Sequence, residues 1–182
     1  FSTDDTKKNE DFSEKTIAEL VRACFEMGKV KTGALIVIER GTPLGEIERT
    51  GIEVDGIVTS QLLINIFEHN TPLHDGAVVI RGNRVTAATC YLPLSDNMDI
   101  SKALGTRHRA AVGVSEATDS VTLVVSEETG RVSVAVSGRL KSVKDGDELR
   151  DMLSVLVKRE TENTGRFRIW KGRRRNERKA DE

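Results

Sequence analysis

The chain has 182 residues, of which 37% are hydrophobic and 31% charged, and its formal net charge is −1. A domain of about 150 residues buries about 70% of the surface that its unfolded chain exposes, so the fold needs no disulfide or metal. The near-neutral charge argues against a chain committed as a whole to nucleic acid, and no apolar run reaches the ~18 residues of a membrane span. We therefore expect one soluble globular domain with polar ends.

The ends of the chain and its two cysteines indicate where that domain lies. We expect residues 1–12 to be a disordered lead-in, residues 13–160 to form the domain, and residues 161–182 to form a separate basic tail. Cys24 and Cys90 lie in apolar stretches without zinc-type spacing, which predicts buried free thiols and a reducing compartment. The sequence lacks a signal peptide and begins with Phe rather than Met, so we expect a fragment of a longer protein.

The first predicted helix starts at a capping-box pattern made by Thr16 and Glu19. Its apolar residues recur at helical spacing as far as Met27, and Gly28 is a plausible stop. The short β-branched run at 34–38 then predicts a buried strand.

The following stretch, 41–58, is rich in glycine and predicts irregular chain. A second helix is expected to be capped by Thr59 or Ser60 and to end at Pro72. Two strands come next, joined by the Gly-Asn dipeptide at 82–83, which is typical of a tight hairpin.

The second half of the chain predicts a short helix at 101–104, a break, and a further helix from Thr106. A hairpin follows, turning at 127–130, and a closing helix begins at a capping box formed by Asp145 and Glu148. About five strands therefore alternate with about five helices. We expect an α/β (α+β) domain whose central mixed β-sheet is flanked by helices.

The tripeptide Asp75-Gly76-Ala77 lies where the second helix gives way to a strand. Gly76 and Ala77 have little side-chain bulk, so a ligand could approach the backbone closely. A carboxylate beside them could bind a metal or accept a proton. An Asp-Gly pair is equally a simple turn, and the residues alone leave both interpretations open.

The segment LGTRHRAAVG places Arg107, His108 and Arg109 among small residues. Gly105 and Thr106 supply a turn, a hydroxyl and the free N–H groups of a helix start, which favour an anion. Each guanidinium can bind phosphate oxygens through two hydrogen bonds. The alternative is a solvated surface cluster, which would oppose the helix dipole, so we favour phosphate binding.

Two further candidates lie outside these motifs. Ser126 and Glu127 end a predicted strand, where a charged hairpin turn is the simpler explanation. Glu127 gains importance if Asp75 needs a partner carboxylate for a divalent cation, and His74 is another possible ligand. His69 is expected on the surface of its helix. The sequence has no GxxxxGK[ST] loop and no GxGxxG after a strand, so a nucleotide would need a different site.

Together these motifs resemble the diadenylate cyclase (DAC) domain. The residues that carry the resemblance are DGA at 75–77, GTRHRA at 105–110 and SEETG at 126–130, extended by KTGALIVIER at 31–40, TSQLLINIF at 59–67 and YLPLS at 91–95. The likeness covers about residues 14–160, and it looks most like the membrane-anchored type of this domain. It implies a cytoplasmic domain whose full-length protein lies in the cell membrane.

The resemblance implies that two ATP molecules are joined into cyclic di-AMP with release of two pyrophosphates, with Mn²⁺, Mg²⁺ or Co²⁺ as cofactor. The product is two-fold symmetric, whereas the chain carries one set of motifs. The simplest arrangement is one ATP per subunit in a face-to-face homodimer.

The resemblance also assigns roles to residues. Asp75 would assist the 3′-hydroxyl as nucleophile, directly or through the metal, and Arg107 and Arg109 would ease charge build-up on pyrophosphate. Residues that would contact the substrate are Gly76, Ala77, Leu92, Gly105, Thr106, Arg107, His108, Arg109 and Ser126. Residues that would hold the metal are Asp75, Glu127 and His74. We expect His108 to be neutral, because two arginines flank it.

Two other functions remain as alternatives. The first is a non-catalytic regulatory module that binds a nucleotide without turnover. The second is nucleic-acid binding by the tail at 166–179, which has eight basic residues and one acidic residue. A solvated tail is the simpler explanation, so no nucleic-acid partner is expected. The tail could also make weak contact with an anionic membrane surface.

Overall fold

The computed structural model describes residues 12–97 and 104–158. Its helices are α1 (Glu14–Lys29), α2 (Gly45–Glu48), α3 (Ser60–Phe67), α4 (Thr106–Ala117) and α5 (Gly146–Leu153), and a π-helical segment, Ser154–Lys158, follows α5. Its strands are β1 (Ala34–Ile38), β2 (Ile52–Ile57), β3 (Ala77–Arg81), β4 (Arg84–Cys90), β5 (Val121–Val125), β6 (Val132–Val136) and β7 (Arg139–Ser142). Of the short helix expected at 101–104, only Leu104 belongs to the described residues. The basic tail at 161–182 lies wholly outside them.

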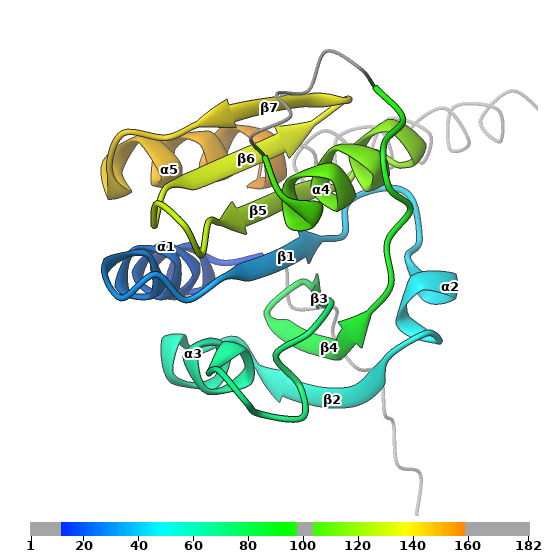
Figure 1. The fold of residues 1–182 in the computed structure, drawn as a ribbon, viewed down its shortest axis with the longest axis horizontal. Coiled ribbons are helices and arrows are strands. Elements are labelled where there is room, and N and C mark those ends of the chain that lie inside the picture. The colour runs from blue at the N-terminus through cyan, green and yellow to red at the C-terminus, as the bar shows by residue number, and fades with distance from the viewer. Residues whose placement is uncertain (1–11, 98–103, 159–182) are drawn as a thin grey trace, which may run out of the picture.

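The seven strands form one sheet in the order β2-β4-β3-β1-β5-β6-β7 (Figure 1). β1 and β3 run parallel, and the other neighbouring pairs are antiparallel. The sheet is therefore mixed, and helices flank it, which confirms the predicted fold class.

Helices cover both faces of this sheet. α1, α3 and α5 pack on one face, where Ile36 and Leu63 belong to the larger core. α4 covers the other face, where Leu35, Leu44 and Ala111 belong to a smaller core. Successive residues of β1 thus enter opposite cores, as alternation along a strand requires, and the strand is buried throughout. No helix among the described residues is long and apolar enough to cross a bilayer.

The prediction of irregular chain at 41–58 was wrong, and β7 was also missed. Both β2 and β7 are edge strands whose residues are mostly exposed. β2 also carries a register shift between Glu53 and Gly56, with Asp55 at a φ of 49°. Edge strands of this kind lack the alternating apolar pattern by which a strand is detected in sequence.

The N-terminal boundaries also need correction. Phe12, assigned to the lead-in, is buried in the larger core. α1 starts after Ser13, whose side chain accepts a hydrogen bond from the backbone N–H of Thr16, so the predicted Thr16–Glu19 capping box is wrong. The Glu19 carboxylate instead accepts a hydrogen bond from the Ser60 N–H at 2.7 Å, which lowers the pKa of that carboxyl. Glu19 therefore couples α1 to the start of α3.

The remaining helix signals are mostly confirmed. Thr59 caps α3 by accepting from the Leu62 N–H, although α3 ends at Phe67, well before Pro72. Asp145 caps α5 by accepting from the Glu148 N–H. Helix α4 begins at Thr106 as predicted.

Both cysteines are buried free thiols, as predicted. Burial raises the pKa of the Cys24 thiol to about 12 and that of Cys90 to about 11. Neither thiol is therefore a reactive nucleophile at neutral pH.

Thr122 on β5 is fully buried, and its hydroxyl has no hydrogen-bond partner among the described residues. Replacing it with valine keeps the shape and removes a buried unsatisfied group, so Thr122→Val is expected to raise the free energy of unfolding by about 1 kcal/mol. Thr118→Val is the matched contrast, because the Thr118 hydroxyl donates to Val114 O at 2.8 Å. The free energy of unfolding measured with urea should rise for Thr122→Val and fall for Thr118→Val. A destabilised Thr122→Val would contradict the expectation.

Candidate active site

The register of the three central strands brings the sequence motifs to one edge of the sheet. Ala34 pairs with Val125 across β1 and β5, while Ile36 pairs with Val78 across β1 and β3. The residues just outside these strands therefore lie side by side: Gly33 before β1, Asp75 and Gly76 before β3, and Ser126 after β5. Residues as far apart in sequence as Gly33 and Ser126 meet here because the strands fix their spacing.

Gly76 joins this edge to the segment that follows β4. It has a φ of 83°, and a Cβ atom there would lie 2.8 Å from the Cys90 carbonyl oxygen. Ala77 pairs with Cys90 in the ladder. Leu92, two residues further, is half-buried and packs against the smaller core, to which Ala77 belongs. The predicted adenine contact and the Asp75 motif are therefore neighbours.

The same segment is fastened to α4. The Ser95 N–H donates to the Arg109 carbonyl oxygen at 3.1 Å, and the Ser95 hydroxyl donates to Glu116 Oε1 at 2.6 Å. Gly113 of α4 lies against the Pro93 carbonyl, where a Cβ atom would clash with the backbone. The YLPLS segment thus spans the distance between β4 and the helix that carries the two arginines (Figure 1).

Asp75 has a strongly exposed side chain, 86% accessible, and its Oδ1 lies 3.4 Å from His74 Nε2. His74 Nδ1 lies 2.6 Å from the Thr71 carbonyl oxygen. A carbonyl can only accept, so Nδ1 carries a proton, and Nε2 is the ring nitrogen that lies beside the carboxylate and can offer a lone pair to a cation. His69 is exposed, as predicted, but it lies beyond the end of α3, with its ring edge-on to His74 at 5.8 Å.

The first turn of α4 is open to an anion. Gly105 is the N-cap and offers no side chain to satisfy the first N–H groups of the helix. Thr106 is exposed, and Arg109 is half-buried with no ion pair for its guanidinium among the described residues. N–H groups without a side-chain cap and a guanidinium at a helix start favour phosphate.

Arg107 points to the strand edge. Its Nη1 lies 3.3 Å from Glu127 Oε2, and its guanidinium lies over Gly33, where a Cβ atom would come within 2.7 Å of Cζ. Helix α4, the start of β1 and the end of β5 therefore meet at one side chain. Neither the Glu127 pair nor the role of Gly33 was predicted from the sequence.

Ser126 shapes the turn that ends at Gly130. Its Oγ accepts from the N–H groups of Glu128 and Thr129, each at 3.2 Å, and the Gly130 N–H donates to the Ser126 carbonyl. Gly130 in turn packs directly against the backbone of Gly28 at the end of α1. The Ser126 hydroxyl proton has no acceptor among the described residues, so it can donate to a ligand.

His108 faces the interior and is 7% exposed. Burial, and then the neighbouring charge of Arg107, lower the pKa of its imidazole below the ordinary 6.5. The expectation of a neutral His108 is therefore supported, although burial rather than the flanking arginines is the larger cause.

The lowered pKa of His108 predicts a pH dependence of stability. Below pH 6.5 the unfolded chain takes up a proton at this histidine before the folded chain does. The contribution of neutral His108 to the free energy of unfolding is therefore fully present above pH 6.5. It is lost as the pH falls through the pKa of the folded state, and the free energy of unfolding changes by no more than about 1.4 kcal/mol per pH unit. The free energy of unfolding, measured with urea between pH 7.5 and pH 5, should fall less steeply with falling pH for His108→Gln than for the parent. Parallel curves would contradict the assignment.

Comparison with known families matches residues 21–140 to the family described as DAC, DisA bacterial checkpoint controller nucleotide-binding. The chain belongs to this family. It is 51% identical over 166 residues to the cyclic di-AMP synthase CdaA of Bacillus subtilis, covering 91% of this chain and 61% of the relative. It is 50% identical over 157 residues to a diadenylate cyclase of Listeria monocytogenes, covering 86% and 58%. The chain thus spans about three fifths of these relatives.

Solved structures of similar proteins share the fold of this DAC-family chain. A double mutant of DacA from Staphylococcus aureus has a TM-score of 0.76 and 48% identity, covering 78% of this chain and 94% of that one. A protein from Bacillus cereus described as a hypothetical membrane spanning protein has a TM-score of 0.69 and 42% identity, covering 71% and 64%.

The three predicted metal ligands of the DAC-family chain are not gathered together. His74 and Asp75 are adjacent, whereas Glu127 pairs with Arg107. Within residues 12–97 and 104–158 no three His, Cys, Asp or Glu side chains are placed to hold one metal ion. Among the described residues, the predicted ligands that lie together are therefore the exposed Asp75 carboxylate and the half-buried His74 imidazole.

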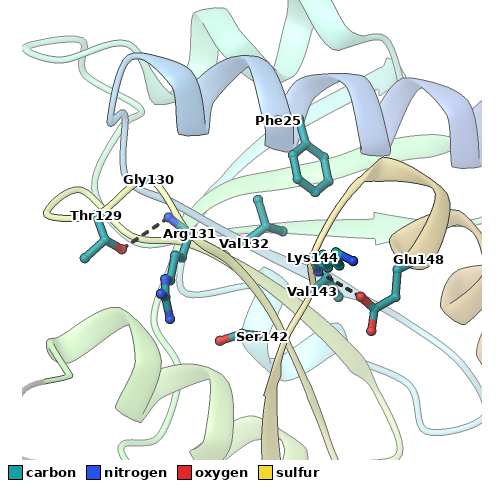
Figure 2. Close-up of a pocket in the computed structure, with 9 residues that line it drawn as sticks. All are labelled: Phe25, Thr129, Gly130, Arg131, Val132, Ser142, Val143, Lys144 and Glu148. Carbon is teal, nitrogen blue, oxygen red and sulfur yellow. Dashed lines mark hydrogen bonds between the residues drawn. The ribbon is translucent and has the colours of Figure 1, made fainter.

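Two of the surface cavities each have a volume of about 520 Å³. One is bounded by Phe25 of α1, the turn at 129–131, and Lys144 and Glu148 near the start of α5 (Figure 2). It shares the turn that Ser126 shapes, but none of the predicted site residues lines either cavity. The candidate site is therefore an open edge of the sheet, where the exposed Asp75 and the start of α4 lie.

Proposed function

We propose that this chain is a diadenylate cyclase, which condenses two ATP molecules into cyclic di-AMP and releases two pyrophosphates. The observation that carries the proposal is the placement of an exposed carboxylate, Asp75, at the same sheet edge as the open cationic start of α4. Relatives with about half of their aligned residues identical are named cyclic di-AMP synthase or diadenylate cyclase, which supports this assignment.

The reaction forms one O–P bond and breaks another at each α-phosphorus. The 3′-oxygen of one ATP attacks the α-phosphorus of the other, and pyrophosphate leaves. Asp75 would hold or accept the 3′-hydroxyl proton. Arg107, Arg109 and the Thr106 turn would bind the triphosphate and stabilise the charge on the leaving pyrophosphate, and Ser126 would donate to a phosphate oxygen.

The base and sugar would lie on the other side of this edge. Gly76 and Ala77 leave room for the nucleotide against the backbone, and Leu92 would contact the adenine. His108 is neutral and inward-facing, so it would orient the helix start rather than act as an acid.

We propose His74 and Asp75 as the protein's ligands for the divalent cation, Mn²⁺, Mg²⁺ or Co²⁺. The free Nε2 lone pair and the exposed carboxylate fit such an ion and leave positions for phosphate oxygens and water. When bound, the cation would make the 3′-alkoxide easier to form. Glu127 would join only by exchanging its Arg107 partner for the ion.

We also propose that catalysis takes place in a homodimer with two such edges face to face. The symmetric product requires two nucleotides, and the site is open rather than enclosed. Tyr91 and Leu94, which are 75% and 54% exposed, place apolar surface beside it. Specific activity should fall on dilution. Constant activity far below measurable dimerisation would contradict this arrangement.

The decisive experiment is incubation of the chain with ATP and Mn²⁺, followed by chromatography and a pyrophosphate assay. We expect cyclic di-AMP and pyrophosphate in a ratio of about one to two. Calorimetric binding of ATP without pyrophosphate release would favour the regulatory module that senses a nucleotide without turnover.

For the whole protein, we propose a cytoplasmic catalytic domain attached to a membrane. The description of the Bacillus cereus neighbour as membrane spanning supports this proposal. Weak binding of the tail to anionic lipid can be tested by vesicle co-sedimentation with and without residues 161–182. No nucleic-acid partner is proposed.

A further inference from the structure

The segment Tyr91–Leu92 has no regular structure of its own, although it lies beside the proposed nucleotide. The residue before it, Cys90, lies so close to Gly76 that a Cβ atom there would come within 2.8 Å of the Cys90 carbonyl oxygen. A second anchor comes from residue Thr50, 41 positions earlier, in the stretch whose sequence predicted irregular chain.

The Thr50 hydroxyl makes two hydrogen bonds. It accepts from the Tyr91 N–H at 2.9 Å, and it donates to the Ile47 carbonyl oxygen at 2.6 Å. The second bond fixes the direction of the hydroxyl, so that its lone pair faces the Tyr91 amide. Thr50 therefore links the end of α2 to the backbone of the segment Tyr91–Leu92, which would contact the adenine.

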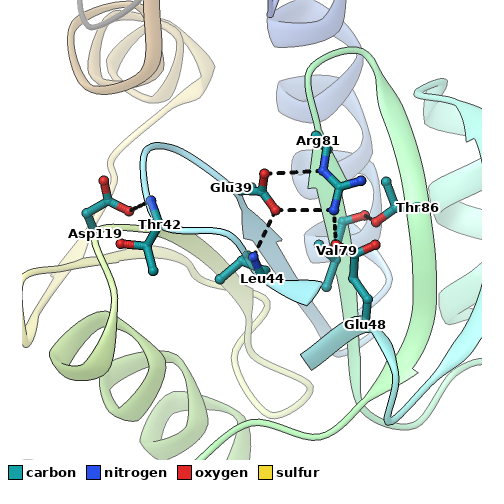
Figure 3. Close-up of polar contacts among 8 residues, drawn as sticks. All are labelled: Glu39, Thr42, Leu44, Glu48, Val79, Arg81, Thr86 and Asp119. Atoms are coloured by element: carbon teal, nitrogen blue, oxygen red, sulfur yellow. Dashed lines mark hydrogen bonds and ion pairs between the residues drawn. The ribbon is translucent and has the colours of Figure 1, made fainter. Parts of the chain in front are cut away.

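The short helix α2 is itself held by charged contacts (Figure 3). Glu39, directly after β1, accepts from the Leu44 N–H at 3.0 Å and from Arg81 Nε at 3.2 Å. Arg81, at the end of β3, also pairs with Glu48 of α2. The hydrogen bond to Glu39 raises the pKa of the Arg81 guanidinium.

A further contact fixes the loop that leads into α2. Asp119, after α4, accepts from the N–H groups of Gly41 and Thr42, each at 2.9 Å. Figure 3 shows the contact with Thr42. The backbone N–H of Thr50 donates to Ile47, so the turn after α2 is closed as well. Thr50 thus follows a helix whose surroundings are fastened to Glu39 after β1, to Arg81 of β3 and to Asp119 between α4 and β5.

From these contacts we propose that Thr50 is a positioning residue for the reaction. Its hydroxyl holds the backbone at 91–92 in the position that receives the adenine, without touching substrate itself. This inference rests on the proposed function. Loss of the hydroxyl should leave the reacting groups at Asp75 and Arg107 in place while it loosens the base-binding segment, so nucleotide affinity rather than the chemical step is affected.

The test compares Thr50→Val, which keeps the shape, with Thr50→Ser, which keeps the hydroxyl. Thr50→Val should raise the KM for ATP about three- to tenfold with kcat within about twofold. Thr50→Ser should restore the parent value. Thr86→Val is the control, because its hydroxyl donates to Val79 nearby (Figure 3) and does not reach Tyr91. An equal KM for the parent and Thr50→Val would overturn the proposal.

A second measurement does not depend on turnover. Amide hydrogen exchange at Tyr91 should become at least several-fold faster in Thr50→Val and stay slow in Thr50→Ser, in the absence of nucleotide. Unchanged exchange would overturn the anchoring role even in an active enzyme. If the parent makes no cyclic di-AMP, the proposed function fails, while the exchange experiment still decides whether Thr50 holds this segment.

Discussion

Asp75→Asn is expected to abolish cyclic di-AMP synthesis, lowering kcat by at least about a hundredfold. Asparagine has almost the same shape, but it cannot accept the 3′-hydroxyl proton and is a poorer ligand for a divalent cation. Asp75 is 86% exposed and is not part of the core, so the fold should not change. Pyrophosphate release under saturating ATP and Mn²⁺ measures the effect.

Two controls separate chemistry from binding and folding. Asp151→Asn removes an exposed carboxylate on α5, on the opposite face of the sheet from α4, and should keep parental activity. Asp75→Asn should still bind ATP in calorimetry, since the arginines at the start of α4 remain. Activity within a few-fold of the parent would remove Asp75 from the proposed mechanism, and the metal arrangement with it.

Much of this candidate site could be predicted because its residue types indicate their chemistry. Asp75 beside two small residues and Arg107 beside a helix start are local patterns, and both lie where the structure has a turn and a helix N-terminus. The buried strands were equally accessible, since β1 and β5 are continuous apolar runs. Local sequence was sufficient wherever one element alone determined the outcome.

What could not be predicted depends on register between distant elements. Glu127 meets Arg107 because β5 is antiparallel to β1 and α4 crosses that end of the sheet, and no spacing in the sequence encodes this pair. Thr50 and β2 lie in a stretch without apolar periodicity. The sequence therefore predicted neither the strand nor the contact between Thr50 and Tyr91. The same limit led to the nomination of Glu127 as a metal ligand without its arginine partner.

Gly33 provides the sharpest test of that assembled geometry. A methyl group at this position would come within 2.7 Å of Cζ and Nη1 of Arg107, so the guanidinium must move away in Gly33→Ala. Removing one well-placed hydrogen-bond donor that stabilises transition-state charge typically lowers kcat by a hundredfold or more. Displacing the Arg107 guanidinium should therefore lower kcat by about ten- to a hundredfold. The fold should tolerate the change, because the displaced atoms belong to the flexible end of a side chain. We expect the free energy of unfolding to stay within about 1 kcal/mol of the parent.

A double-mutant cycle shows whether Gly33 acts through Arg107. In an Arg107→Gln background there is no guanidinium to displace, so adding Gly33→Ala should have little further effect on kcat. Gly45→Ala is the matched control, because a Cβ atom there meets no atom within 4 Å and activity should stay at the parental level. Additive losses from Gly33→Ala and Arg107→Gln would mean that the glycine matters for another reason. A strongly non-additive cycle would instead make the lack of a side chain at Gly33, which lets the Arg107 guanidinium lie there, a determinant of where the triphosphate is held.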